Sequence, residues 1–330
     1  MKVSLKNIIV PSIPLAVFSI GCCVALWMSA FLGARYATQP TESSTATQVL
    51  QFFFLPNTLL SNIISAGFTL LNAFLLAQLN NRFTIIRTRT FLPILIFMLL
   101  MSTWNETHLV NGSHFALTLF IFSLFFFLNM YRDTKAVEQA FMGSFLICAG
   151  SLIITPLIYL IPVCWLGFML VQSFSLRTLL ASLFGALSPW IIYIAGVFYF
   201  QPDVDIRQFL ISQFGYEFSL PILSIPIIIY TSALILILLI SLGGMYSNFH
   251  NETIRTRTNL NFILFLLIAV SIITILHVNQ FAVFLPVIAF SYSMLVSNSF
   301  TLRLNNFNGI LFIVFCLLNL VFVISKYIFY

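Results

Sequence analysis

Two short segments of this chain combine arginine and threonine in a pattern suited to binding a phosphate group. The first contains Arg87 and Arg89, the second contains Arg255 and Arg257, and an apolar stretch follows each segment. Guanidinium groups one residue apart can hold phosphate oxygens through paired hydrogen bonds, and the neighbouring threonines can cap the helix that follows. The segments predict a site for an anionic lipid or a phosphate-bearing ligand. Two alternatives are ordinary anchoring by basic residues on the cytoplasmic side and a parallel internal duplication of the chain.

Three carboxylates in polar loops are the candidates for acid–base chemistry. Asp203 and Asp205 precede apolar side chains that recur at helical spacing, which predicts a short amphipathic helix on the membrane surface. Each aspartate is either a catalytic acid or base beside the membrane, or a group that caps and stabilises the start of that helix. Glu42 belongs to a loop rich in serine and threonine, where it is either catalytic or an ordinary solvated side chain.

Other polar residues are less specific in their chemistry. Glu106, His108 and His114 lie close together in the sequence, but their spacing fits no established metal-binding pattern, so we predict no metal site. The sequence does not identify a cofactor. Asn62 and Asn72 occur in an apolar stretch at a spacing that places them on one helix face, where we expect them to bond a neighbouring helix.

The elements that must position these residues are membrane helices. Of the 330 residues 61% are hydrophobic, and only 14 are Lys or Arg and 8 are Asp or Glu. The charged fraction of 7% compares with about 25% in soluble domains, which excludes a soluble protein, a nucleic-acid-binding protein and a disordered chain. Because the apolar stretches are continuous rather than alternating, they predict an all-α polytopic transmembrane helical bundle, a single membrane domain over residues 1–330.

Polar clusters divide the chain into about eleven predicted membrane spans, the third of which begins at 91 or near Phe83. Their approximate limits are 12–34, 57–79, 91–104, 115–131, 139–154, 156–173, 179–200, 222–242, 259–276, 281–297 and 308–328. With the N-terminus inside and the C-terminus outside, 11 of the 14 basic residues fall on the cytoplasmic side, as the positive-inside rule requires. The spans carry essentially no charge, which argues against an ion-coupled transporter.

The general pattern of the chain resembles an uncharacterised family of Bacteroidota inner-membrane proteins. The likeness rests on many Phe-rich spans, on Asn80-Asn-Arg82 followed by Arg87-Thr-Arg89, and on a tight hairpin at Thr155-Pro156. It implies a multi-pass protein of the bacterial inner membrane and brings no established activity.

The layout is also similar to that of GT-C-type membrane glycosyltransferases, which use polyprenyl-phosphate sugars and an essential acid in the first outer loop. That resemblance implies a transferase that acts on a lipid-linked glycan at the outer face. The resemblance implies that Glu42 would be the essential acid and that Asp203 and Asp205 would be supporting acids.

Two other functions fit the sequence. A non-catalytic subunit that holds partner membrane proteins fits the short loops and the very apolar spans. A lipid or small-molecule transporter is the third hypothesis, although the spans lack charged groups for coupling. The expected partners are therefore the lipid bilayer, a lipid-linked glycan or anionic lipid, and partner membrane proteins, but no nucleic acid.

Overall fold

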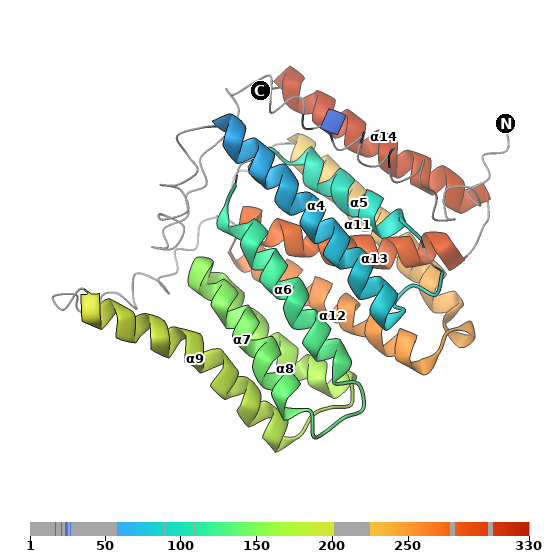
Figure 1. Ribbon diagram of the computed structural model, residues 1–330. Coiled ribbons are helices and arrows are strands. Elements are labelled where there is room, and N and C mark those ends of the chain that lie inside the picture. Colours follow the sequence, from blue (N-terminus) through green and yellow to red (C-terminus); the bar gives the residue numbers. More distant parts are fainter. Residues whose placement is uncertain are drawn as a thin grey trace.

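The computed structural model describes residues 58–200, 225–277, 281–302 and 306–329, except 89 and 109, together with residues 17, 21, 24, 25 and 27. This part of the chain is all helical and contains no strand. Its α-helices are α4 (Thr58–Phe83), α5 (Leu92–Thr103), α6 (Gly112–Asn129), α7 (Val137–Ile153), α8 (Leu160–Leu170), α9 (Leu176–Phe200), α11 (Ile225–Ser247), α12 (Ile254–Leu276), α13 (Phe281–Leu302) and α14 (Asn306–Phe329). Three single-turn helices are η2 (Asn105–Thr107), η3 (Thr155–Tyr159) and η4 (Phe249–Asn251). Figure 1 shows the long helices lying side by side as a bundle.

Seven of the described helices are long and apolar enough to cross a membrane, namely α4, α6, α9, α11, α12, α13 and α14. The predicted all-α, multi-pass architecture is therefore confirmed, whereas the count of about eleven spans stays a prediction. The predicted span 12–34 lies almost entirely outside the described residues. Helix α5 matches the predicted span 91–104, but its 12 residues extend only about 18 Å and the bilayer core is about 30 Å thick.

The helix boundaries follow the local sequence. Helix α4 continues to Phe83, past the predicted end at residue 79, and Pro93 lies in the first turn of α5. Proline fits there because the first helical residues have no N–H bond to lose. The predicted hairpin at Thr155-Pro156 is present as η3, which separates α7 from α8.

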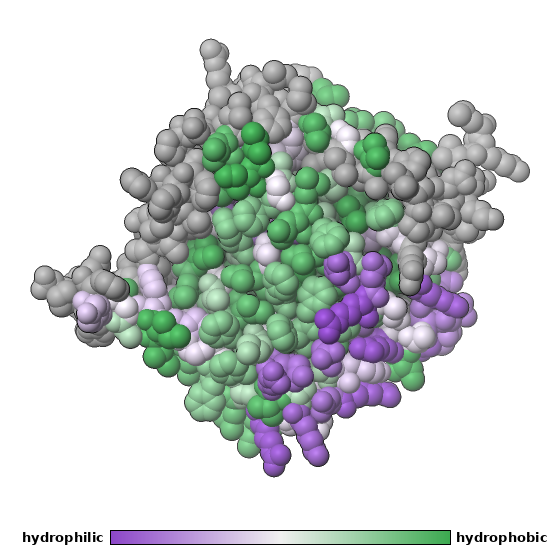
Figure 2. All heavy atoms as spheres, in the orientation of Figure 1, coloured by the Kyte–Doolittle hydropathy of each residue, from purple (hydrophilic) through white to green (hydrophobic). Residues whose placement is uncertain are grey.

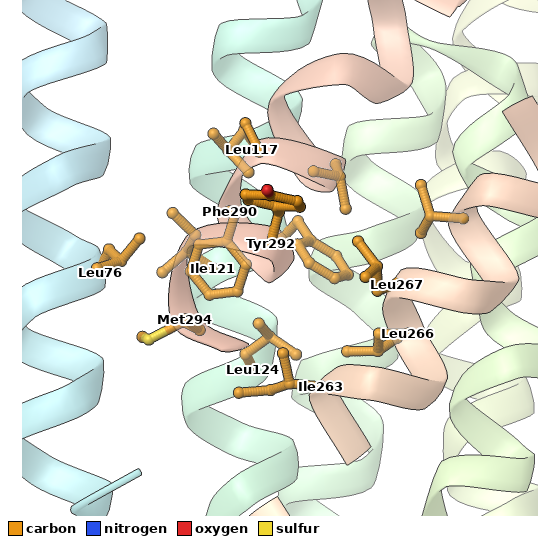
Figure 3. Packing of buried hydrophobic residues seen from close by; sticks show 14 of the residues in the cluster. Leu76, Leu117, Ile121, Leu124, Ile263, Leu266, Leu267, Phe290, Tyr292 and Met294 are labelled. Carbon is orange, nitrogen blue, oxygen red and sulfur yellow. The ribbon is translucent and has the colours of Figure 1, made fainter. Parts of the chain in front are cut away.

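Helix α13 forms the centre of the bundle, because α5, α6, α11 and α12 all pack against it. Figure 3 shows the core that results, with side chains from four helices pointing toward one another. Buried members of this core are Leu76, Leu117, Ile121, Leu124, Ile263, Leu266, Leu267, Phe290, Tyr292 and Met294. The Phe290 ring meets Phe120 of α6 edge to face, with centroids 6.3 Å apart. Dispersion and close packing hold helices together in lipid, since the hydrophobic effect does not operate between them.

The outer helices expose large apolar side chains. Helices α9, α11 and α14 each present several of them, among which Leu176, Ile192, Ile225, Leu239 and Val321 are exposed. Figure 2 shows that apolar residues dominate this face of the molecule, while strongly hydrophilic residues gather at one end. Such a surface is expected where lipid tails surround a protein.

Candidate functional site

The two Arg-Thr segments lie against each other at one end of the bundle. Thr256, in the first turn of α12, donates its hydroxyl to the Thr84 carbonyl at 3.3 Å across a sequence separation of 172 residues. Arg87 donates from Nη1 to the Asn251 carbonyl at 3.4 Å, so each segment contacts the loop that precedes the other's helix. The fold therefore joins two basic segments that the sequence only showed to be alike.

Three arginines from three elements surround two aromatic rings at this end. The guanidinium carbons of Arg82 and Arg255 lie 5.6 and 5.9 Å from the centroid of the Phe83 ring. Those of Arg132 and Arg255 lie 5.4 and 5.6 Å from the centroid of the Tyr131 ring. We call these five residues the arginine–aromatic cluster. Guanidinium groups that contact rings through their faces keep N–H groups along their edges for hydrogen bonds to phosphate.

The cluster brings three cations close to the positive end of a helix dipole. Helix α12 has no acidic residue in its first turn, although the helix dipole makes that end positive, and Arg255 adds a charge of the same sign. Among the described residues, no carboxylate forms an ion pair with Arg82, Arg132 or Arg255. A bound anion would relieve this repulsion, because it would pair with several cations at once.

The start of α12 is held by the cap that its sequence predicts. The Thr253 hydroxyl accepts a hydrogen bond from the Thr256 backbone N–H at 3.2 Å. Arg257 donates from Nε to the Glu252 carbonyl at 3.0 Å and from Nη2 to the His250 carbonyl at 3.1 Å. Arg257 thus orders the loop before the helix, whereas Arg255 points to the aromatic rings.

The predicted site residues divide into two groups. Arg87, Arg255 and Arg257 come together as described, although only Arg255 joins the cluster. Arg89 and the predicted catalytic acids Glu42, Asp203 and Asp205 lie outside the described residues. Within the described part of the chain, no three His, Cys, Asp or Glu side chains gather to hold a metal ion.

Sequence reasoning missed Arg82 and Arg132 as members of the site. Each is the direct neighbour of an aromatic residue at a helix end, in the pairs Arg82-Phe83 and Tyr131-Arg132. That adjacency was the available signal. The sequence does not show that the two pairs form one site. The fold does, because Arg255, which is distant in the sequence, contacts both rings.

The opposite end of the bundle holds a buried polar network. His114 Nε2 lies 2.7 Å from the Ser65 hydroxyl and 3.0 Å from the Thr107 carbonyl, and Asn72 donates to the His114 carbonyl at 3.3 Å. All four residues are buried, so the network ties α4 and η2 to α6. The prediction that Asn72 bonds a neighbouring helix is confirmed.

The helices, their apolar flanks and the basic end together define a multi-pass helical membrane protein. In comparisons with known proteins, no family model, no curated protein and no solved structure matches this chain. The resemblances to Bacteroidota inner-membrane proteins and to GT-C-type glycosyltransferases therefore stay predictions from the sequence.

Proposed function

We propose that this protein binds the phosphate-bearing headgroup of an anionic lipid at the basic end of the bundle. The observation that carries the proposal is the convergence of Arg82, Arg132 and Arg255 on the rings of Phe83 and Tyr131. Basic pockets between membrane helices at the cytoplasmic surface are the usual sites for anionic lipid headgroups. Arginine suits them because its planar fork pairs with two phosphate oxygens.

The position of the cluster supports a lipid as the source of the phosphate. The cluster lies where α4 and α6 end and α12 begins, and such helix ends meet the headgroup layer of a bilayer. Exposed apolar side chains on the outer helices would contact the acyl chains of the same lipid. Arg87 lies next to this region, where it would add a further positive charge.

We infer that the basic end faces the cytoplasm of a bacterial cell and that the chain resides in the inner membrane. Positive charge near short loops is retained on the cytoplasmic side during insertion. Helix ends and the adjoining loops at this side of the bundle carry the described Arg82, Arg87, Arg132, Arg177 and Arg255, which supports an N-terminus inside and a C-terminus outside.

The test compares two double variants that remove the same charge. In Arg82→Gln with Arg255→Gln, both cations on the Phe83 ring are lost. In the control, Lys135→Gln with Arg177→Gln, two exposed cations outside the cluster are lost. Native mass spectrometry of the full chain in detergent, titrated with phosphatidylglycerol, measures the fraction that carries lipid.

We expect the cluster variant to bind phosphatidylglycerol at least about tenfold more weakly, because each charge-assisted hydrogen bond contributes about 1.5–3 kcal/mol. The control variant should bind it as the unmodified protein does. Equal losses in both variants would show only general charge attraction and would overturn the site. Equal binding of phosphatidylcholine and phosphatidylglycerol would overturn the preference for an anion.

Transfer to a lipid-linked glycan at the outer face is a separate proposal that rests on the sequence alone. Glu42 would be its essential acid, so Glu42→Gln should abolish transfer while the protein still inserts and folds. Unchanged glycan products in cells carrying this variant would end that proposal. The structural subunit is a third proposal, and purification of the protein without any stoichiometric partner would count against it.

A further inference from the structure

The side chain of Asn298 is the least satisfied polar group in the described core. It lies on the central helix α13, is fully buried, and neither its amide nitrogen nor its amide oxygen has a hydrogen-bond partner. The neighbouring Ser297 hydroxyl is buried and unpartnered as well. In a membrane core each such group costs several kcal/mol, because lipid cannot replace the lost hydrogen bonds. These atoms therefore point to a hydrogen-bonding ligand.

The adjacent helix α12 carries another buried polar atom without a hydrogen-bond partner. Asn259 is fully buried, its Nδ2 donates to the Phe83 carbonyl at 3.4 Å, and its Oδ1 has no partner. Helices α12 and α13 pack against each other and run in opposite directions. Figure 3 shows Ile263 and Met294 in one apolar cluster. Asn259 precedes Ile263 by one helical turn and Asn298 follows Met294 by one turn, so on these two helices both residues lie toward the basic end.

We propose that ordered water hydrogen-bonds to the buried side-chain amide of Asn298 on α13 and to the amide oxygen of Asn259 on α12. A water molecule accepts from an amide nitrogen and donates to an amide oxygen, so it satisfies both kinds of orphan atom at these two residues. A metal cation would coordinate only the oxygens and would leave the Asn298 nitrogen unpaired. The site is independent of the proposed lipid site, although Asn259 is bonded to the backbone of Phe83, whose ring belongs to the arginine–aromatic cluster.

Hydroxyl-radical labelling by X-ray pulses tests the proposal directly. Radiolysis of bound water produces radicals inside the protein, and methionine is oxidised readily to its sulfoxide. Met294, one turn from Asn298 and fully buried, is the natural reporter. We expect Met294 to be oxidised in the folded full chain and this oxidation to be lost in Asn298→Leu, which removes the polar partner of the water. Absence of Met294 oxidation in the unmodified protein, or equal oxidation in both proteins, would overturn the proposal.

Thermal stability provides a second measurement, because the Tm of Asn298→Leu should change in opposite directions for a dry and for a hydrated site. If the site were dry, Asn298→Leu would remove an unsatisfied amide and raise the Tm, whereas with bound water it removes hydrogen bonds and lowers the Tm. Asn298→Ser keeps a hydroxyl and leaves space for one more water, so Met294 oxidation should persist in it. If Asn298→Leu does not fold, Asn298→Ser still tests for ordered water, since loss of Met294 oxidation in Asn298→Ser would contradict the proposal.

Discussion

Tyr230 of α11 joins three helices through one side chain. Its hydroxyl donates to Asn319 Oδ1 of α14 at 2.9 Å and lies 3.3 Å from the Thr103 hydroxyl of α5. Its ring stacks on Phe322, with the two centroids 3.9 Å apart. The lipid around a membrane protein offers no hydrogen bonds, so buried hydroxyl and amide groups must find each other.

Replacing Tyr230 with phenylalanine keeps the ring and removes only the hydroxyl. Asn319 Oδ1 then loses its donor inside the bundle, so we expect the free energy of unfolding to fall by about 1–2 kcal/mol. Thermal unfolding of the purified protein in detergent would show this as a lower Tm. The control is Tyr246→Phe, because the Tyr246 hydroxyl makes only a 3.5 Å contact with Asn261 at an exposed position. Equal Tm values for the two variants would contradict the role assigned to Tyr230.

The candidate site was partly predictable at the level of single residues. The matching spacing of the two Arg-Thr segments identifies Arg87 and Arg255 from the sequence alone. The spacing did not show that Arg257 binds backbone carbonyls, since that depends on how the loop before α12 turns. Arg82 and Arg132 belong to the arginine–aromatic cluster because Arg255 contacts the same two rings. A single sequence carries no information on such long-range distances.

Helices α7 and α9 approach each other closely because Gly185 has no side chain. A Cβ at this position would collide with the backbone carbonyl oxygen of Phe141 on α7. Hydroxyl groups add to the same interface, where the Ser144 and Ser182 oxygens are 2.5 Å apart. Small residues and short hydrogen bonds are the usual means by which membrane helices associate.

Gly185→Ala should therefore disrupt the α7–α9 interface. The added methyl group meets backbone rather than a flexible side chain, so the helices must separate, at a cost of about 1–3 kcal/mol. Gly196→Ala on the same helix is a matched control, because a Cβ there has no atom within 4 Å. Urea or heat unfolding in detergent would measure both. The idea fails if the two alanine variants are equally stable.

The positions of the helices were largely predictable, whereas their depth in the bundle was not. Each predicted span after the first corresponds to a described helix, because long apolar stretches bounded by polar clusters have few other interpretations. Hydropathy alone does not distinguish α13 at the centre from α9, which is equally apolar but far less buried, since lipid and protein interior are both apolar. The small polar residues Ser291, Ser293 and Ser297 were the available sign that α13 is enclosed.

The described part of the molecule has a basic end, and its orientation can be tested chemically. In a protein that lacks its 5 native cysteines, Thr88→Cys and Lys135→Cys place thiols at exposed positions of this end, and Asn105→Cys places one near the opposite end. We expect a membrane-impermeant maleimide to label the first two only in inverted vesicles and the third only in right-side-out vesicles, because positive loops stay in the cytoplasm. The reverse pattern would show that the N-terminus lies outside.

The enclosure of α13 has a consequence for how the protein is made. The four helices that surround it, α5, α6, α11 and α12, all precede it in the chain and are synthesised first. Until α13 arrives, the faces that it will cover contact lipid or one another. Packing of α13, before α14 is added, is therefore an exchange of lipid for a helix that carries several serines, which are better accommodated among assembled neighbours than in the bilayer.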